Sequence, residues 1–277
     1  MWSREWSRAV GRLWQKPLLC VGAWSAIGGL GLWAAPPVGA LSVSPTVVEL
    51  RLAVGATAQG AFQVVNDTQS PVTLSVEVES LAPASYAPLS PDQWLQVSPA
   101  TLTLAPRQQA EVAYVVVVPH DLSGELAAEV VFVQHVSSGS ATGLQVRFGM
   151  AVYISIAGTE RLQLKAGSLR LQNGQPPTVL IPLTNDGNVH CRPEGSVVVR
   201  NGHGEILAHG TLTRGMPAPP RRVEHFTIRL AAPVFAPGMY QVTADLTCYA
   251  TAEPPAHVIV ETTGELSPDG QWTLNPS

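Results

Sequence analysis

The sequence predicts an all-β protein with two tandem immunoglobulin-like β-sandwiches. Val-, Thr- and Leu-rich runs alternate with turn clusters, and 24 Gly and 24 Pro residues interrupt the 277-residue chain. Apolar residues nowhere recur at helical spacing over three turns behind a capping signal, so we expect no long helix. Residues 92–131 are the most informative stretch. This stretch contains, in order, a Trp-Leu segment, a β-branched run, a Val-Pro stop and a Leu-Ser-Gly turn. Such an order is typical of half of a sandwich.

Residues 1–40 have the pattern of a secretory signal peptide. Four basic residues from Arg4 to Lys16 precede an uncharged apolar run from Leu18 to Ala35. Two prolines and a Val-Gly-Ala triplet follow, which predicts cleavage between Ala40 and Leu41. The alternative is an uncleaved membrane anchor, because about 18 apolar residues lie at the lower limit for crossing a bilayer.

Cleavage would make the chain distinctly acidic. It removes four of 16 basic and one of 20 acidic residues, which leaves 12 against 19 and a net charge of about −7. Nucleic acid and anionic membrane surfaces need clustered Lys and Arg, so we expect neither as a partner; a membrane would be met only through an uncleaved signal segment. The predicted location is the periplasm, the cell surface or the medium, reached by a Sec-type signal peptide.

Residues 41–157 are expected to form the first sandwich. Turn signals such as Asn-Asp, Ser-Pro and Ser-Gly separate eight predicted strands, at 41–52, 56–66, 72–81, 94–97, 102–104, 111–118, 125–135 and 144–156. The last of these alternates, so one face belongs to a core and the other faces solvent or a partner. Its apolar face includes Val146, Phe148, Met150, Val152 and Ile154.

Residues 158–264 repeat this rhythm after a short hinge at 157–159. Seven strands are predicted, the number of a minimal sandwich, at 162–172, 178–184, 189–200, 206–212, 223–230, 240–249 and 257–261. Residues 265–277 are polar and rich in Pro and Gly without periodicity, so we expect a flexible tail.

Two cysteines lie in the second sandwich. Cys191 opens its third predicted strand and Cys248 closes the sixth, and these strands are antiparallel neighbours in an immunoglobulin-type sandwich. A disulfide between them is predicted, which an exported protein permits. The alternative is a pair of buried free thiols, which behave as small hydrophobic side chains.

Several segments carry a family resemblance. "SVSPTVVELRLAVG", "WLQVSP", "LTLAP", "VVVVP" and "VRFGMAVYISIAGT" resemble the first domain of PapD-like extracytoplasmic proteins, the group that includes periplasmic pilus chaperones. "PLTNDGNVHCRPEGSVVVRNGHGE" and "FAPGMYQVTADL" are similar to the second domain of bacterial surface proteins such as the WxL-interacting proteins. Together the matches cover most of residues 41–262.

The resemblance to pilus chaperones implies a mechanism. Such a chaperone lends the last strand of its first domain to a subunit, which makes residues 146–154 the candidate partner-binding strand. It also implies a basic anchor for the subunit's terminal carboxylate, an Arg on the first strand and a Lys on the last. Residues 45–48 are uncharged and residues 150–152 hold no Lys, so Arg51 and Arg147 are the nearest, displaced candidates. The alternative is an ordinary core strand whose alternation reflects one buried face.

No catalytic pattern is present in the sequence. It contains no G-x-S-x-G elbow, Walker loop or G-x-G-x-x-G, and His190, His203 and His209 lack a compact ligand spacing. We therefore predict that the protein is not an enzyme and has no catalytic residue, metal site or cofactor.

The predicted function is protein binding outside the cytoplasm. A chaperone-like factor for pilus or surface-protein subunits, acting by strand addition, is the leading hypothesis. The alternative is a structural cell-surface protein or a carbohydrate- or cell-wall-binding protein. Sugar binding would need exposed aromatic side chains, for which the candidates are Tyr86, Trp94, Tyr153, Tyr249 and Trp272.

Overall fold

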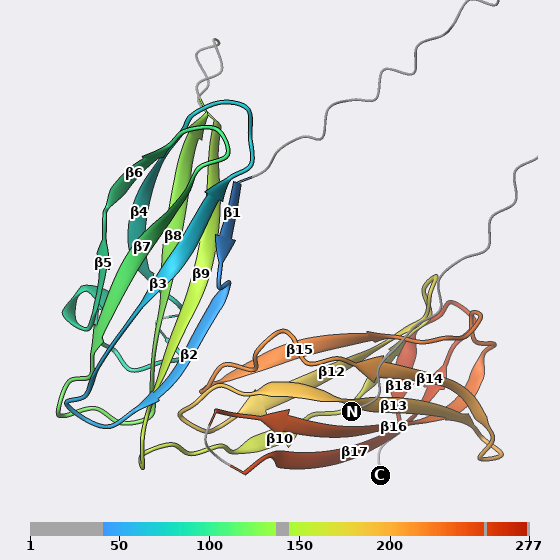
Figure 1. Ribbon diagram of the computed structural model, residues 1–277. Helices are drawn as coiled ribbons and strands as arrows, with labels where there is room; N and C mark the ends of the chain where they lie inside the picture. Colours follow the sequence, from blue (N-terminus) through green and yellow to red (C-terminus); the bar gives the residue numbers. More distant parts are fainter. Residues whose placement is uncertain (1–40, 83, 137–143, 252–253, 276–277) are drawn as a thin grey trace, which may run out of the picture. The chain divides into compact units, whose positions relative to one another are not determined.

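The computed structural model describes residues 41–82, 84–136, 144–251 and 254–275 (Figure 1). The predicted signal peptide, residues 1–40, lies outside the described residues, as does the Ala40 side of its cleavage site. Among the described residues, no helix has the length and apolar character that a membrane span requires. The predicted fold class is confirmed, because strands pair into four sheets that make two all-β sandwiches.

The first sandwich divides its strands between two sheets. The first sheet has the order β1-β3-β7-β5, with β1 (Leu41–Ser44), β3 (Thr57–Asn66), β7 (Gln109–Val117) and β5 (Leu95–Ser98). The second has the order β2-β9-β8-β4-β6, with β2 (Val47–Leu52), β9 (Leu144–Ile156), β8 (Glu125–Val136), β4 (Val72–Ser80) and β6 (Thr101–Leu104). A 3-10 turn at Pro91–Gln93 precedes β5.

The segment predicted as one strand at 41–52 is two strands in different sheets. β1 pairs antiparallel with β3, whereas β2 pairs parallel with β9, and residues 45 and 46 carry the chain across between them. Val43 and Val48 are both buried but lie five positions apart, so the alternation changes phase between β1 and β2 without showing which strands each half joins. The crossing matters because it leaves β2 beside only part of β9.

The core between these sheets is dense and aromatic at its centre. Phe62 on β3 lies against both Tyr114 and Phe132, with ring centroids 5.3 and 5.9 Å apart. Trp94 is 2% exposed and belongs to the same cluster. Each fully buried large apolar side chain contributes about 1.5–3 kcal/mol relative to exposure.

The second sandwich is built on the same plan. In one sheet β12 (Thr178–Asn185) pairs on one side with β15 (Arg222–Arg229) and on the other with the short strands β10 (Leu164–Ala166) and β11 (Arg170–Gln172). The other has the order β14-β13-β16-β17-β18, with β14 (Ile206–Leu212), β13 (Arg192–Asn201), β16 (Gly238–Tyr249), β17 (Ala256–Leu266) and β18 (Trp272–Leu274).

Cys191 and Cys248 are joined by a disulfide, with their Cα atoms 5.6 Å apart. Cys191 immediately precedes β13 and Cys248 lies near the end of β16, and these strands pair antiparallel, as predicted. Both cysteines are buried in the second core. The bridge therefore joins two neighbouring strands of one sheet at their ends.

The end of the chain differs from the expected flexible tail. β17 continues to Leu266, and β18 pairs with it. The physical reason is tertiary: Trp272 packs against the second core, and its indole Nε1 donates to the carbonyl of Leu169 at 3.2 Å. Gly264 makes room for this ring, because a Cβ at that position would collide with it.

Each sandwich has a buried asparagine at the end of one strand, where the chain turns a corner. Asn66 ends β3 and Asn185 ends β12, and each side-chain amide donates to backbone carbonyls of neighbouring loops. The backbone carbonyl of Asn66 accepts from the backbone N–H of Arg107, and that of Asn185 accepts from the backbone N–H of Arg221. Both arginines have a left-handed φ, 64° and 60° respectively. Asn66 is fully buried, so the Asn-Asp turn signal marks a structural corner.

Candidate partner-binding site

The two sides of β9 are covered unequally. β8 pairs with β9 along its whole length, from Glu125–Ser155 to Val136–Leu144. β2 pairs with it only from Ala151 to Ile156 (Figure 1). On the side away from β8, residues 146–150 have no strand partner in the described part of the chain. This short open edge of β9, residues 146–150, is the candidate partner-binding site.

The five predicted partner-binding side chains fall into two groups. Val152 and Ile154 are fully buried core residues where β2 covers the strand, and Met150, which is 6% exposed, is a buried residue at the end of the open edge next to β2. Val146 and Phe148 are half-buried on the open edge, and Phe148 packs against the rim of the first core. The sequence left open whether this strand binds a partner or is an ordinary core strand. The second half is a core strand, and the first half keeps an open edge.

The displaced anchor residues do not come together. The β2–β9 register places Arg51 opposite Ser155. Ser155 lies eight residues from Arg147 on β9, which is about 26 Å along a strand. Arg51 Nε donates to Glu160 Oε1 at 2.6 Å, and Arg147 bonds to Glu79 and lies 3.5 Å from Glu77. Arg51 and Arg147 cannot jointly hold one carboxylate, because their separation is too large and each charge is already paired.

A second cluster, which the sequence did not indicate, is a polar junction formed by Glu49, Glu125, His190 and Arg192, in which Glu125 and His190 are buried and Glu49 is exposed. Glu125 is 1% exposed and His190 2%. The carboxylate of Glu125 accepts from the backbone N–H of His190 at 2.8 Å and lies 2.9 Å from its Nδ1. Ser155 donates to the same carboxylate at 3.1 Å. Glu125 and His190, which are 65 positions apart in sequence, thus satisfy each other's hydrogen-bonding groups in the interior.

Glu49 completes the polar junction from β2. Its Oε1 accepts from Arg192 Nε at 3.0 Å and Nη2 at 2.7 Å, and lies 3.4 Å from His190 Nε2. The ring of Tyr153 lies over the imidazole, with centroids 4.1 Å apart. Glu49 and Glu125 belong to the first sandwich and His190 and Arg192 to the second, and no local spacing in the sequence marks such a pairing.

The polar junction shifts the pKa values of His190 and Glu49. Burial alone lowers the pKa of His190, but its hydrogen bonds to Glu125 and Glu49 outweigh burial and raise the pKa to about 9. The hydrogen bond from His190, opposed by burial and reinforced by Arg192, lowers the pKa of Glu49 to about 2. His190 is therefore protonated and Glu49 ionised at neutral pH.

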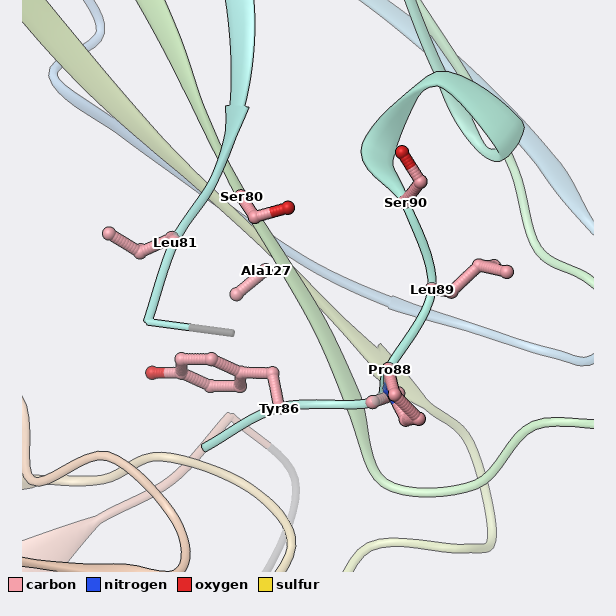
Figure 2. A pocket seen from close by; sticks show the side chains of 8 residues that line it. Ser80, Leu81, Tyr86, Pro88, Leu89, Ser90 and Ala127 are labelled. Carbon is pink, nitrogen blue, oxygen red and sulfur yellow. The ribbon is translucent and has the colours of Figure 1, made fainter. Parts of the chain in front are cut away.

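A small pocket lies beside the polar junction, next to Tyr86. Its volume is about 150 Å³, below the roughly 300–1,000 Å³ typical of small-molecule sites. Figure 2 shows the Tyr86 ring near Ala127, with Ser80 and Ser90 on separate segments of the chain. Within the described ranges, no group of three His, Cys, Asp or Glu side chains is placed to hold a metal ion.

The aromatic residues considered for sugar binding serve other purposes. Tyr86, Trp94 and Tyr153 are each less than 5% exposed. The guanidinium of Arg214 lies 3.7 Å from the ring centroid of Tyr249, and Trp272 packs against the second core. None of these five forms an open platform for a sugar ring.

Comparisons with known proteins find similarity only among solved structures. No family model matches the chain, and no curated protein sequence matches it. The chain is similar to the YadV chaperone (8% identity, TM-score 0.45, 80% of this chain and 98% of that one). It is also similar to a chain of the Salmonella enterica SafA pilin in complex with the SafB chaperone (15% identity, TM-score 0.44, 82% and 99%).

A further similar structure is the class 5 fimbriae chaperone CfaA, at 13% identity and a TM-score of 0.42, covering 80% of this chain and 98% of that one. Pilus chaperones, the relatives that the sequence motifs suggested, thus reappear among solved structures. None of these likenesses assigns a function or a site residue to this chain.

Proposed function

We propose that the chain binds an extracytoplasmic protein subunit by accepting one of its extended segments at the open edge of β9. The observation that carries the proposal is the unequal cover of β9, whose residues 146–150 lack a strand partner on one side in the described part of the chain. Open strand edges present unpaired N–H and C=O groups that template a further strand.

Side chains at this edge suit strand addition. An added strand would continue the line of β2, since β2 begins where the open edge ends, at the pairing of Val47 with Ala151. Val146 and Phe148 point to the same face as the buried Met150. Alternate apolar residues of the added strand would cover them and extend the first core.

The partner class follows from the resemblance noted in the sequence, a pilus or surface-protein subunit. In this proposal the chain acts in the periplasm or at the cell surface after removal of residues 1–40. A chaperone releases its client, whereas a structural surface component keeps it, so the two differ in the lifetime of the complex.

The test replaces Val146 and Phe148 together with Glu, which places charge where the added strand would bury apolar side chains. We expect loss of copurifying subunits from the native envelope with an unchanged melting temperature. Ile259→Glu is a matched control, because Ile259 is an exposed apolar strand residue of the second sandwich. Retention of the partner by the folded double variant would reject this edge as the docking site.

A further inference from the structure

The outer face of the β4-β8-β9 sheet carries an uneven set of charges next to the open edge. Its register places Val131 opposite Gly149 and Glu129 opposite both Ala151 and Glu79. Glu77, Glu79 and Glu129 are the acidic side chains of this patch, and Arg147 is its basic one. Three carboxylates therefore face one guanidinium.

Arg147 is directed away from the open edge. It starts on β9 but bonds to Glu77 and Glu79 on β4, so its side chain crosses over β8. Val131 and Val133 lie on this outer face of β8 and are nevertheless only 2% and 1% exposed, which fits the aliphatic stem of Arg147 lying over them. The positive charge of Arg147 is thus neutralised on the far side of β8.

Glu129 leans in the opposite direction, toward the open edge. A Cβ built on Gly149 would collide with Oε1 and the carboxyl carbon of Glu129, so the carboxylate fills the space that a side chain at 149 would take. The φ of Gly149 is not in the left-handed region, so the backbone does not require glycine there. In the described chain, the half-exposed Glu129 carboxylate makes no hydrogen bond or ion pair.

We infer that Glu129 and Gly149 form a subsite for a Lys or Arg side chain carried by the strand that adds to β9. This inference rests on the proposed strand addition. Neighbouring strands lie about 4.8 Å apart, so an outward residue beside Gly149 comes within reach of the Glu129 carboxylate. Charge complementarity selects the occupant, since the patch has an excess of carboxylates and Arg147 is turned away.

The test uses synthetic nine-residue peptides with alternating Thr and Val and a central outward Lys, Gln or Glu. Binding to the full chain is measured by fluorescence anisotropy in low salt. We expect the Lys peptide to bind about two- to fivefold more tightly than the Gln peptide, and the Glu peptide to bind more weakly than both. Added NaCl should reduce the Lys advantage by screening an exposed pair.

Variants separate the subsite from strand addition itself. Glu129→Gln should abolish the Lys advantage and leave the Gln peptide unaffected, whereas Glu77→Gln, a carboxylate of the same face turned away from the edge, should preserve it. A Lys advantage that is absent, or that survives Glu129→Gln, overturns the subsite while strand addition stands. If no peptide binds, or if the Val146→Glu/Phe148→Glu variant binds the Gln peptide normally, strand addition fails and the subsite fails with it.

Discussion

At the residue scale, the polar junction formed by Glu49, Glu125, His190 and Arg192 places two ionisable side chains, Glu125 and His190, in the interior. Burying a charge is unfavourable unless a partner and further hydrogen bonds compensate it. Glu125 has three such bonds, from the His190 backbone, the His190 imidazole and Ser155. Loss of the His190 imidazole removes the counter-charge of Glu125.

We predict that His190→Gln destabilises the protein by about 3–5 kcal/mol, because Glu125 then remains buried without a counter-charge. Urea unfolding followed by circular dichroism measures the loss. Lys165→Ala provides the control: its ion pair with Asp186 is exposed, and such pairs contribute about 0–1 kcal/mol. Equal effects of the two variants would contradict the assigned role of the junction.

The junction also predicts a pH dependence. The pKa of His190 rises on folding from 6.5 to about 9, so its stabilisation is complete below pH 6.5 and is lost as pH rises through 9. The melting temperatures of wild type and His190→Gln should therefore converge between pH 6.5 and 10. A gap that stays constant over this range would exclude a protonated His190 in the folded protein.

Glu49 predicts a pH dependence of stability in the opposite direction. Its pKa falls on folding from 4.5 to about 2, so its stabilisation is present above pH 4.5 and is lost as pH falls through 2. Glu49→Gln should lower the melting temperature at pH 6 and have progressively less effect toward pH 2. An undiminished effect at pH 2 would show that charge on Glu49 is not the cause.

At the element scale, β9 combines a core strand and an open edge. Ile154→Ala should lower the free energy of unfolding by about 2–5 kcal/mol, since a fully buried branched side chain leaves a cavity. Val146→Ala, on the half-buried edge, should cost less than about 1 kcal/mol. Thermal or urea unfolding of both variants checks the contrast, and similar losses would mean that the edge is packed as a core.

At the scale of the whole molecule, the disulfide ties the ends of two strands that are 57 residues apart in sequence. In the chain-entropy model such a loop contributes about 4 kcal/mol. Reduction, or Cys191→Ser with Cys248→Ser, should lower the free energy of unfolding by about that amount. Mass spectrometry with and without reductant verifies the bridge, and two alkylatable thiols in the native protein would disprove it.

Much of the fold was predictable from the sequence because strands leave a local signature. Alternation and turn residues depend on neighbours within a few positions, so they indicated the all-β class and most strands. The 191–248 pairing followed from the order of strands in an immunoglobulin-type sandwich. Local pattern did not reveal which strands pair on either side of the crossing at residues 45 and 46, or the docking of Trp272, since both depend on which distant strand lies alongside.

The candidate site shows the same division. The sequence by itself determined that 144–156 is an alternating strand with apolar residues at 146, 148, 150, 152 and 154. Tertiary structure alone decided that β2 covers its second half, that Arg147 turns away to Glu77 and Glu79, and that Glu125 meets His190. The physical reason is that backbone periodicity is set locally, whereas burial and charge pairing depend on contacts between residues distant in sequence.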